Sequence, residues 1–580
     1  MSKHATNQRR LNKRAIAYAF VLACLLAAPL AALAAIAPDS VAEQITLFGL
    51  VQFGKASGLA LAGIVFACTL ILAFLAFTRL PGALERLNAV KVPAWIDIHL
   101  NRRTVLVVTL IILACWIPVL YLVFPGATKT DTVNQLYQFL SEKPTWYSAT
   151  GDVIDAEFID HHPVFDTFLL GAFAWIGRLA GSDAAGLFAY TIFQTALVAA
   201  ACATAICYTE RLGIHPVLRI AALVLIIVAP IFPGSAVTAQ KDSLFAAFIV
   251  VYTVLFMEAI RTKGNAFASK GFLAGFIAVT CLCMLSKKTG VALMVLCGIV
   301  LICALRGKRT RAAAAVLAPL LACSLLWPAI VYPTANVAPG GSQEAWGMLY
   351  QQTVSTLKKH PEAAGDAERA AIDAVIDLDR ALEKHVSWRT DEVKRCARAE
   401  STTQDRFTFL GAWAKIGLAH PSDYLMATAY CSAALLVPST PFSLAYDIDQ
   451  STVSSFASHA DKLGVSFTLD AVNPEPNQAA AKAVYGAYDA LCQAPIISLF
   501  FTSGFWGGWI PLITLVATFF FRKRSSLALA PIVFSALLLI VSPAPMPRYV
   551  VSLAFLALPA IAWMLYAAQM AEPGSRKSKR

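Results

Sequence analysis

Long apolar segments, each close to the length that crosses a lipid bilayer, recur along almost the whole chain. A membrane-spanning helix needs about 20 mostly apolar residues. Segments of this kind lie at 15–37, 58–78, 104–124, 185–208, 215–236, 241–260, 271–287, 290–305, 312–333, 496–521, 527–543 and 549–569. Only 14% of the 580 residues are charged, well below the share in water-soluble domains. We therefore expect an all-α polytopic membrane protein with about twelve transmembrane helices.

The distribution of charge predicts how these helices are oriented. The chain carries 47 Lys and Arg against 35 Asp and Glu, a net charge of +12. With the amino terminus in the cytoplasm, the short inner segments hold 26 of the bases and five of the acids. Two long outer segments, 125–184 and 334–495, hold 27 acids and 16 bases. This positive-inside pattern explains the basic charge without nucleic acid as a partner, and it places both termini in the cytoplasm.

The same topology divides the chain into four parts. They are a two-helix extension and cytoplasmic loop (1–103), a membrane core with its first outer loop (104–333, loop 125–184), a mainly helical extracytoplasmic domain (334–495), and three transmembrane helices with a basic tail (496–580). The first apolar segment has a basic start, as signal peptides do, but its length favours a membrane anchor.

Three stretches of the outer segments allow more than one reading. Residues 164–181 and 424–440 are apolar, and we expect helices at the outer interface, with a membrane span as the alternative. Residues 438–475 are rich in Pro, Ser, Thr and Asp and predict a loop. One disulfide among Cys396, Cys431 and Cys492 is possible in an oxidising exterior, and the sequence does not favour a pair.

Four cations depart from the positive-inside pattern. Lys241, Lys287, Lys288 and Arg548 fall in short outer turns or at outer helix ends, and Asp242 follows Lys241 directly. Cations gathered at one membrane face suit a phosphate or pyrophosphate head group. Snorkelling of the side chains or a local Lys–Asp pair is the alternative.

Asp131 lies about six residues beyond the third span, so we expect it near the membrane surface. A carboxylate that faces phosphate-binding cations can act as the general base for a hydroxyl acceptor. Capping of the helix TVNQLYQFL is the alternative role for this residue.

Asp160, His161 and His162 follow in the same outer loop, directly before Pro163. The imidazoles could bind a divalent metal, position a phosphate or transfer a proton. Adjacent residues of a helix point about 100° apart, so one ion would require the extended backbone that proline favours. Asp152, Asp155 and Glu157 instead suit a solvated acidic face.

Gln351 and Gln352 stand on a predicted helix after the ninth span, where paired amides could hydrogen-bond sugar hydroxyls. A solvated helix face explains them equally well. Neither a Walker A sequence nor a zinc-type set of paired C-x-x-C motifs occurs in the chain. Transport driven by nucleotide hydrolysis in this chain alone is therefore not expected.

An Asp soon after a span, followed by His-His-Pro before an interfacial helix, resembles the GT-C superfamily of integral membrane glycosyltransferases. Protein mannosyltransferases and lipid A aminoarabinose transferases share this layout. The chain more closely resembles an uncharacterised bacterial polytopic family assigned to that superfamily. The motifs that carry the resemblance are PGATKTDTVNQ, HHPVFDT, QKDSLF, LYQQT and PMPRYV.

The resemblance implies transfer of a sugar from a polyprenyl-phosphate donor to a cell-envelope glycan, lipid or protein, outside the bacterial cytoplasmic membrane. Asp131 would be the catalytic acidic residue. The substrate-binding residues would be Asp160, His161, His162, Lys241, Asp242, Lys287, Lys288, Gln351, Gln352 and Arg548. Thr132 stands where the mannosyltransferases have a second acid, which leaves open whether Mg²⁺ or Mn²⁺ binds at Asp131 or His161.

Two other functions remain as alternatives. A transporter or flippase of lipid-linked sugars predicts polar and charged residues in the middle of the spans, whereas here charge lies at their ends. A non-catalytic envelope scaffold would leave the Asp131, His161 and Lys241 set without a role. It predicts unchanged glycans when those residues are replaced.

Overall fold

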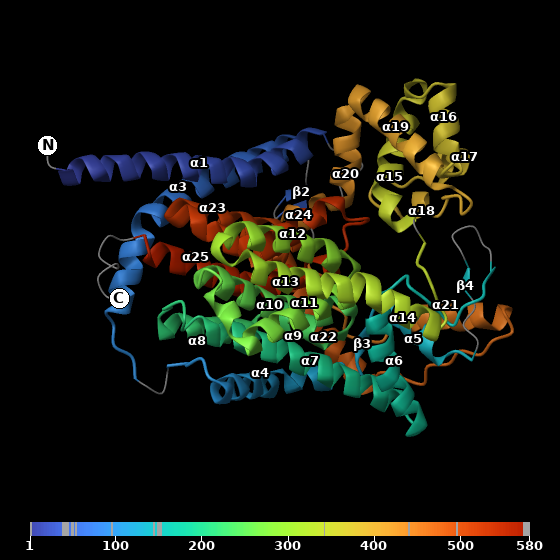
Figure 1. Ribbon diagram of the computed structural model, residues 1–580, viewed down its shortest axis with the longest axis horizontal. Helices are drawn as coiled ribbons and strands as arrows, with labels where there is room; N and C mark the ends of the chain where they lie inside the picture. The colour runs from blue at the N-terminus through green and yellow to red at the C-terminus, as the bar shows by residue number, and fades with distance from the viewer. Residues whose placement is uncertain are drawn as a thin grey trace.

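The computed structural model describes residues 3–36, 46–47, 51–52, 55–93, 97–142, 146–147, 153–341, 343–438, 441–494 and 497–571 of the chain. Regular structure in these residues is almost entirely helical, and each strand has two residues. In Figure 1 most of the long apolar helices run along the horizontal axis, and the polar helices of residues 343–419 lie at the upper right.

Three helices form the centre of the molecule: α7 (Asp183–Tyr208), α10 (Lys241–Arg261) and α25 (Val551–Gln569). Helix α4 (Arg102–Leu122) lies at the edge of the molecule. Helix α10 packs against α7 and α25, and α4 packs against α7. Because its apolar side chains lie on all sides, α10 is buried along nearly its whole length. The largest apolar cluster surrounds these helices and includes Trp116, Phe232, Tyr252 and Trp563.

The remaining apolar helices pack around this centre. They are α8 (Pro216–Val228), α9 (Ile231–Val237), α11 (Lys270–Ser286), α12 (Lys288–Ala304), α13 (Arg309–Leu321), α14 (Trp327–Thr334), α23 (Ile510–Arg522) and α24 (Ala530–Leu538). The amino-terminal pair, α1 (Lys3–Ile36) and α3 (Lys55–Asn88), lies along one edge, where α1 contacts α23. Strands β1 (Thr46–Leu47) and β2 (Val51–Gln52) pair between α1 and α3.

Eight helical stretches of the described chain are long and apolar enough to cross a membrane. A ninth arises if α8 and α9, which meet at a 55° bend, form one broken span. Helices α11 and α12 coincide with predicted spans but have 17 residues each, and predicted spans 496–521 and 527–543 overlap one stretch, Phe505–Val541. The structure confirms an all-α protein with several candidate membrane helices. It does not establish the predicted number of twelve.

The first outer loop contains α5 (Thr130–Leu140) and α6 (Val164–Leu179), together with β3 (Ala127–Thr128), β4 (Trp146–Tyr147), β5 (Val153–Ile154) and β6 (Phe158–Ile159). Two parallel pairings join this loop to distant parts of the chain. Strand β3 pairs with β7 (Thr238–Ala239), directly before α10, and β6 pairs with β8 (Val337–Ala338), at the start of the outer domain. These pairings bring three segments that are far apart in sequence to one end of the bundle.

The outer domain is helical, as predicted. Helix α15 (Gln343–Lys359) is surrounded by α16 (Asp366–Asp373), α17 (Leu378–Lys384), α18 (Asp391–Lys394), α19 (Thr403–Ala419) and α20 (Pro421–Leu436). Two further helices, α21 (Gln450–Lys462) and α22 (Glu475–Gln493), complete the segment. Neither α6 nor α20 is among the candidate membrane spans, in line with the interfacial reading of 164–181 and 424–440.

The loop predicted at 438–475 is partly wrong, because α21 occupies its middle. The Asp449 carboxylate accepts a hydrogen bond from the Thr452 backbone amide and caps this helix. Val453, Phe456 and Ala460 then pack on the apolar face of α5. Tertiary packing of this face outweighs the weak helix propensity of its Ser and Thr residues. The thirteen cysteines are all free thiols, so the disulfide considered for the outer domain is not formed.

Candidate functional site

A cavity of about 1110 Å³ lies where the first outer loop, the starts of two candidate membrane helices and the outer domain meet. Asp131 of α5 and Lys241 of α10 line it on the membrane side, together with Arg548 in the short turn Pro547–Val550 before α25. Helices α17 and α18 of the outer domain supply another wall. The cavity therefore joins chain segments that are more than 400 residues apart in sequence.

The pairing of β3 with β7 explains how Asp131 comes to lie beside Lys241. Its register sets Thr128 opposite Ala239, and α5 and α10 each begin two residues later. The buried Thr132 hydroxyl donates a hydrogen bond to the Ala239 carbonyl at 2.5 Å, which ties the first turn of α5 to this strand. Both helices therefore present their first turns to the same space.

The Asp131 carboxylate is the centre of a compact ionic cluster. Its Oδ2 lies 2.7 Å from Lys241 Nζ and 2.7 Å from an Arg548 guanidinium nitrogen. His162 Nδ1 lies 3.8 Å from the same oxygen and 2.9 Å from Lys241 Nζ. The three contacts of Asp131 are all to Oδ2, and the structure brings together four of the residues singled out from the sequence.

These contacts set the ionisation of the cluster. Burial alone would raise the pKa of Asp131, but the charges of Lys241 and Arg548 outweigh it and hold that pKa well below its usual value. Burial and the nearby Lys241 ammonium lower the pKa of His162 well below the usual imidazole value. Because Lys241 donates to Nδ1, the neutral ring carries its proton on Nε2.

A third cation, Lys129, lines the cavity two residues before Asp131 and was not singled out from the sequence. Burial, followed by the charge of Arg548, lowers its pKa. Lys129 lies in a long segment that is predicted to be outer, where bases are common. Its charge therefore does not depart from the positive-inside pattern. Its place in the turn KTD directly before Asp131 is the signal that could have found it.

His161 also lines the cavity, but it faces the outer domain rather than Asp131. Its Nδ1 lies 3.9 Å from Glu344, whose other oxygen accepts a hydrogen bond from Lys394 at 2.7 Å. Glu344 and Lys394 both line the cavity, and their contacts connect His161 to the outer domain. Among the described residues, no third His, Cys, Asp or Glu joins Asp131 and His161 in a group that could hold a metal ion.

Four predicted substrate-binding residues do not line the cavity. They are Asp160, Asp242, Lys287 and Lys288. Lys287 pairs with the buried Asp242 at 2.6 Å, and Lys288 pairs with Asp160 at 3.3 Å and also donates to its backbone carbonyl. Both are tertiary pairs between residues 45 and 128 positions apart, and neither is a local pair of neighbouring residues. The prediction that they contact substrate is not supported by their position.

Gln351 and Gln352 also lie outside the cavity, which corrects their predicted place beside a sugar. Gln351 is fully buried and donates to the Val386 carbonyl at 2.7 Å. Gln352 donates to Thr428 and accepts from the Trp413 indole, both at 2.9 Å. Their amides therefore hold the outer domain together. Of the acidic residues set aside as solvated, Asp155 is exposed, and Asp152 lies outside the described residues.

Asp166, in the first turn of α6 and four residues after His162, is a buried acid that the sequence did not predict to be buried. Its side chain is 2% exposed, and neither carboxylate oxygen has a hydrogen-bond partner in the described chain. Burial raises the pKa of Asp166 well above its usual value.

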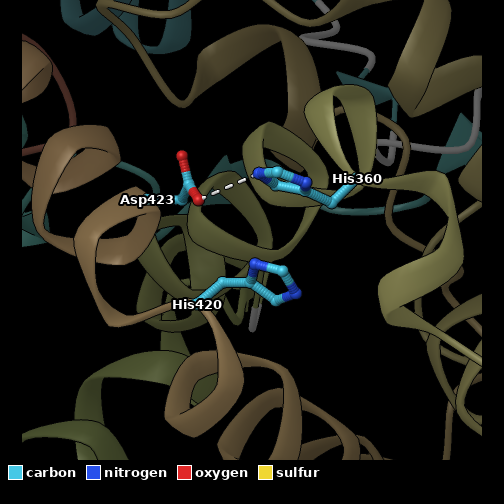
Figure 2. A group of neighbouring side chains, drawn as sticks. All are labelled: His360, His420 and Asp423. Carbon is cyan, nitrogen blue, oxygen red and sulfur yellow. Dashed lines mark ion pairs between the residues drawn. The ribbon is translucent and has the colours of Figure 1, made fainter.

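His360, His420 and Asp423 form a second cluster of ligand-type side chains, in the outer domain and away from the cavity (Figure 2). His360 Nε2 lies 3.4 Å from Asp423, and the two imidazoles stack with centroids 4.5 Å apart at 25°. Such nearly parallel rings do not direct their nitrogen lone pairs to one point. Lys359, 2.9 Å from Asp423, already supplies a cation. The cluster therefore serves the packing of this domain.

Comparison with known proteins gives a family but no activity. The model of a family of unknown function (DUF6020) matches residues 3–579. The chain belongs to this family. The match includes the bundle, the outer domain and every cavity-lining residue. No curated protein and no solved structure matches the chain.

Proposed function

We propose that the protein is a GT-C-type glycosyltransferase that moves a sugar from a polyprenyl-phosphate donor to a cell-envelope acceptor. The proposal places it in a bacterial cytoplasmic membrane with twelve spans, both termini in the cytoplasm and the cavity on the outer face. The positive-inside charge pattern and the position of the cavity at the polar end of the bundle support this topology.

One observation carries the proposal: a buried carboxylate and three cations line one cavity at the ends of apolar helices. Lys241 and Arg548 bring two positive charges to Asp131, which neutralises only one of them, and Lys129 lines the same cavity. An excess of positive charge in a partly buried site favours a bound anion. A lipid phosphate fits here because Lys241 and Arg548 begin membrane helices, so the lipid tail could stay in the bilayer.

The reaction follows from these charges as a single displacement. The acceptor hydroxyl attacks the anomeric carbon of the donor sugar while the bond from that carbon to the phosphate oxygen breaks. Asp131 takes the hydroxyl proton, and polyprenyl phosphate leaves with the bonding electron pair. Lys241 and Arg548 stabilise the charge that grows on this phosphate. The sugar is transferred with inversion.

The ion pairs of Asp131 also explain how the base would be controlled. Held by Lys241 and Arg548, this carboxylate has a depressed pKa and is a weak base. A donor phosphate that binds between these cations would share their charge, and the pKa of Asp131 would rise toward its usual range. The base would then become active only when the donor is bound. The Nε2–H of neutral His162 remains as a hydrogen-bond donor to substrate.

The test is to replace Asp131 in cells that lack the chromosomal gene. Asp131→Asn keeps the shape but removes the base, and we expect at least a hundredfold loss of sugar transfer in isolated membranes at equal protein level. Asp155→Asn is the matched control, because Asp155 is exposed in the same loop and does not line the cavity. Undiminished transfer by the Asp131→Asn protein would reject the proposal.

A further inference from the structure

The wall that the outer domain contributes to the cavity is strongly basic. Five cations of this domain line the cavity, namely Arg380, Lys384, Lys394, Arg395 and Arg398. Three acids of the same domain line it with them, Glu344, Asp391 and Glu392. This wall carries no residue of the Asp131 cluster, so its charge needs a separate explanation.

Part of this charge is neutralised within the domain. Lys394 lies 2.7 Å from both Glu344 and Asp391, and Arg398 lies 2.9 Å from Asp373. Arg395 makes one longer contact, 3.5 Å from Glu392, and its side chain is 66% exposed. These residues form a network that is close to balanced.

Arg380 and Lys384 are not part of that network. Both are exposed, and no acidic side chain of the described chain lies within ion-pair distance of either. They are four residues apart on α17, so they lie on the same face of this helix. The buried Ala381 fixes the helix against the domain core, which directs that face into the cavity. Two like charges held side by side without a counterion are unfavourable unless an anion binds.

The neighbouring acids of α17 do not relieve this charge. Asp379 and Glu383 each precede a cation by one position and lie about 100° from it around the helix. Glu383 is also three residues beyond Arg380, but the two side chains do not form an ion pair. Neither acid lines the cavity. The helix therefore separates its charges, with the cations toward the cavity and these acids away from it.

We propose that Arg380 and Lys384 bind the acceptor, and that the acceptor is an anionic glycan bearing phosphate or carboxylate groups. This inference rests on the proposed function. The donor phosphate is assigned to Lys241 and Arg548, which begin membrane helices, whereas α17 belongs to the outer domain. An anion on α17 is therefore on the part of the substrate that extends away from the bilayer. The acceptor hydroxyl reaches Asp131 through the same cavity.

The experiment measures binding without requiring catalysis. Full-length protein in phosphatidylcholine nanodiscs is titrated with fluorescent oligogalacturonate, with its uncharged methyl ester, and with an oligomer of glycerol phosphate. We expect the charged probes to bind, with an affinity that falls as salt rises, and the ester to bind at least tenfold more weakly. The stronger of the two charged probes assigns carboxylate or phosphate as the recognised group.

Arg380→Gln with Lys384→Gln should weaken binding of the charged probes at least tenfold, and Lys384→Gln alone should give a smaller loss. Lys462→Gln with Lys482→Gln is the matched control, because these exposed lysines of α21 and α22 do not line the cavity. Equal binding by the α17 variant and wild type, equal binding of the ester, or no binding of either charged probe would overturn the inference.

Asp131→Asn separates this inference from the proposed function. The variant should still bind the charged probes, because its α17 is unchanged, while transfer is lost. Probe binding that depends on α17, together with normal transfer by Asp131→Asn, would reject the glycosyltransferase mechanism and leave an anion site on α17.

Discussion

At the scale of single residues, the Asp131 carboxylate determines the chemistry of the cavity. Two cations lie 2.7 Å from one of its oxygens, and they lower its pKa although burial alone would raise it. A depressed pKa means that the charged form stabilises the folded protein above pH about 4, the pKa in the unfolded chain. This contribution is lost as the pH falls through the lower pKa of the folded state.

Asp166 should behave in the opposite way, because burial raises its pKa. The unfolded chain ionises this group above pH about 4, whereas the folded protein releases the proton only at a higher pH, so its contribution to stability falls as the pH rises between the two. Asp166→Asn is neutral at every pH and should remove this loss. We expect the apparent Tm of the variant to exceed that of wild type increasingly between pH 5 and 9.

Thermal unfolding of the purified protein across this pH range measures the effect of Asp166→Asn. The exposed Asp155→Asn is again the control and should follow wild type. A variant that is less stable than wild type by the same amount at every pH would show that Asp166 is not held as a neutral acid.

At the scale of elements, the two-residue pairing of β3 with β7 positions the site. It sets the first turn of α5 beside the first turn of α10, and the Thr132 hydroxyl reinforces it with a hydrogen bond to Ala239. Removal of this buried donor leaves a carbonyl without its partner, which costs about 1–3 kcal/mol. A small shift of α5 then moves Asp131 relative to Lys241.

Thr132→Val should therefore lower sugar transfer at least tenfold, because misplacement of a catalytic group by about 1 Å is costly. Thr132→Ser keeps the hydroxyl and should restore most of the activity. Transfer assays at equal protein level compare the two variants. Equal loss in both would show that the hydroxyl does not by itself account for the effect, and no loss in either would show that this hydrogen bond does not position Asp131.

Sequence reasoning succeeded for elements where local composition decides the outcome. Apolar runs placed most of the membrane helices, and the exceptions to the positive-inside pattern found Lys241 and Arg548. It failed where the partner of a side chain depends on the fold. Nothing in the sequence shows that Lys287 pairs with Asp242, that Gln351 is buried against Val386, or that a Ser-rich segment packs on α5 as α21.

At the scale of the whole molecule, the helical bundle and the outer domain enclose one cavity with cations at both ends. The membrane end carries Asp131 with Lys241 and Arg548, and the outer end carries Arg380 and Lys384. The proposed reaction assigns the lipid-linked donor to the first end and an anionic acceptor to the second. In this proposal the outer domain supplies the acceptor site.

The most direct test of the central claim compares lipid-linked sugars and envelope glycans between cells that lack the protein and wild-type cells, by mass spectrometry. The account predicts that one sugar is missing from an envelope glycan and that the polyprenyl phosphate carrying this sugar accumulates. Both changes should be reversed by the wild-type gene but not by the Asp131→Asn variant. Unchanged glycans and unchanged lipid-linked sugars in the deletion cells would contradict the account.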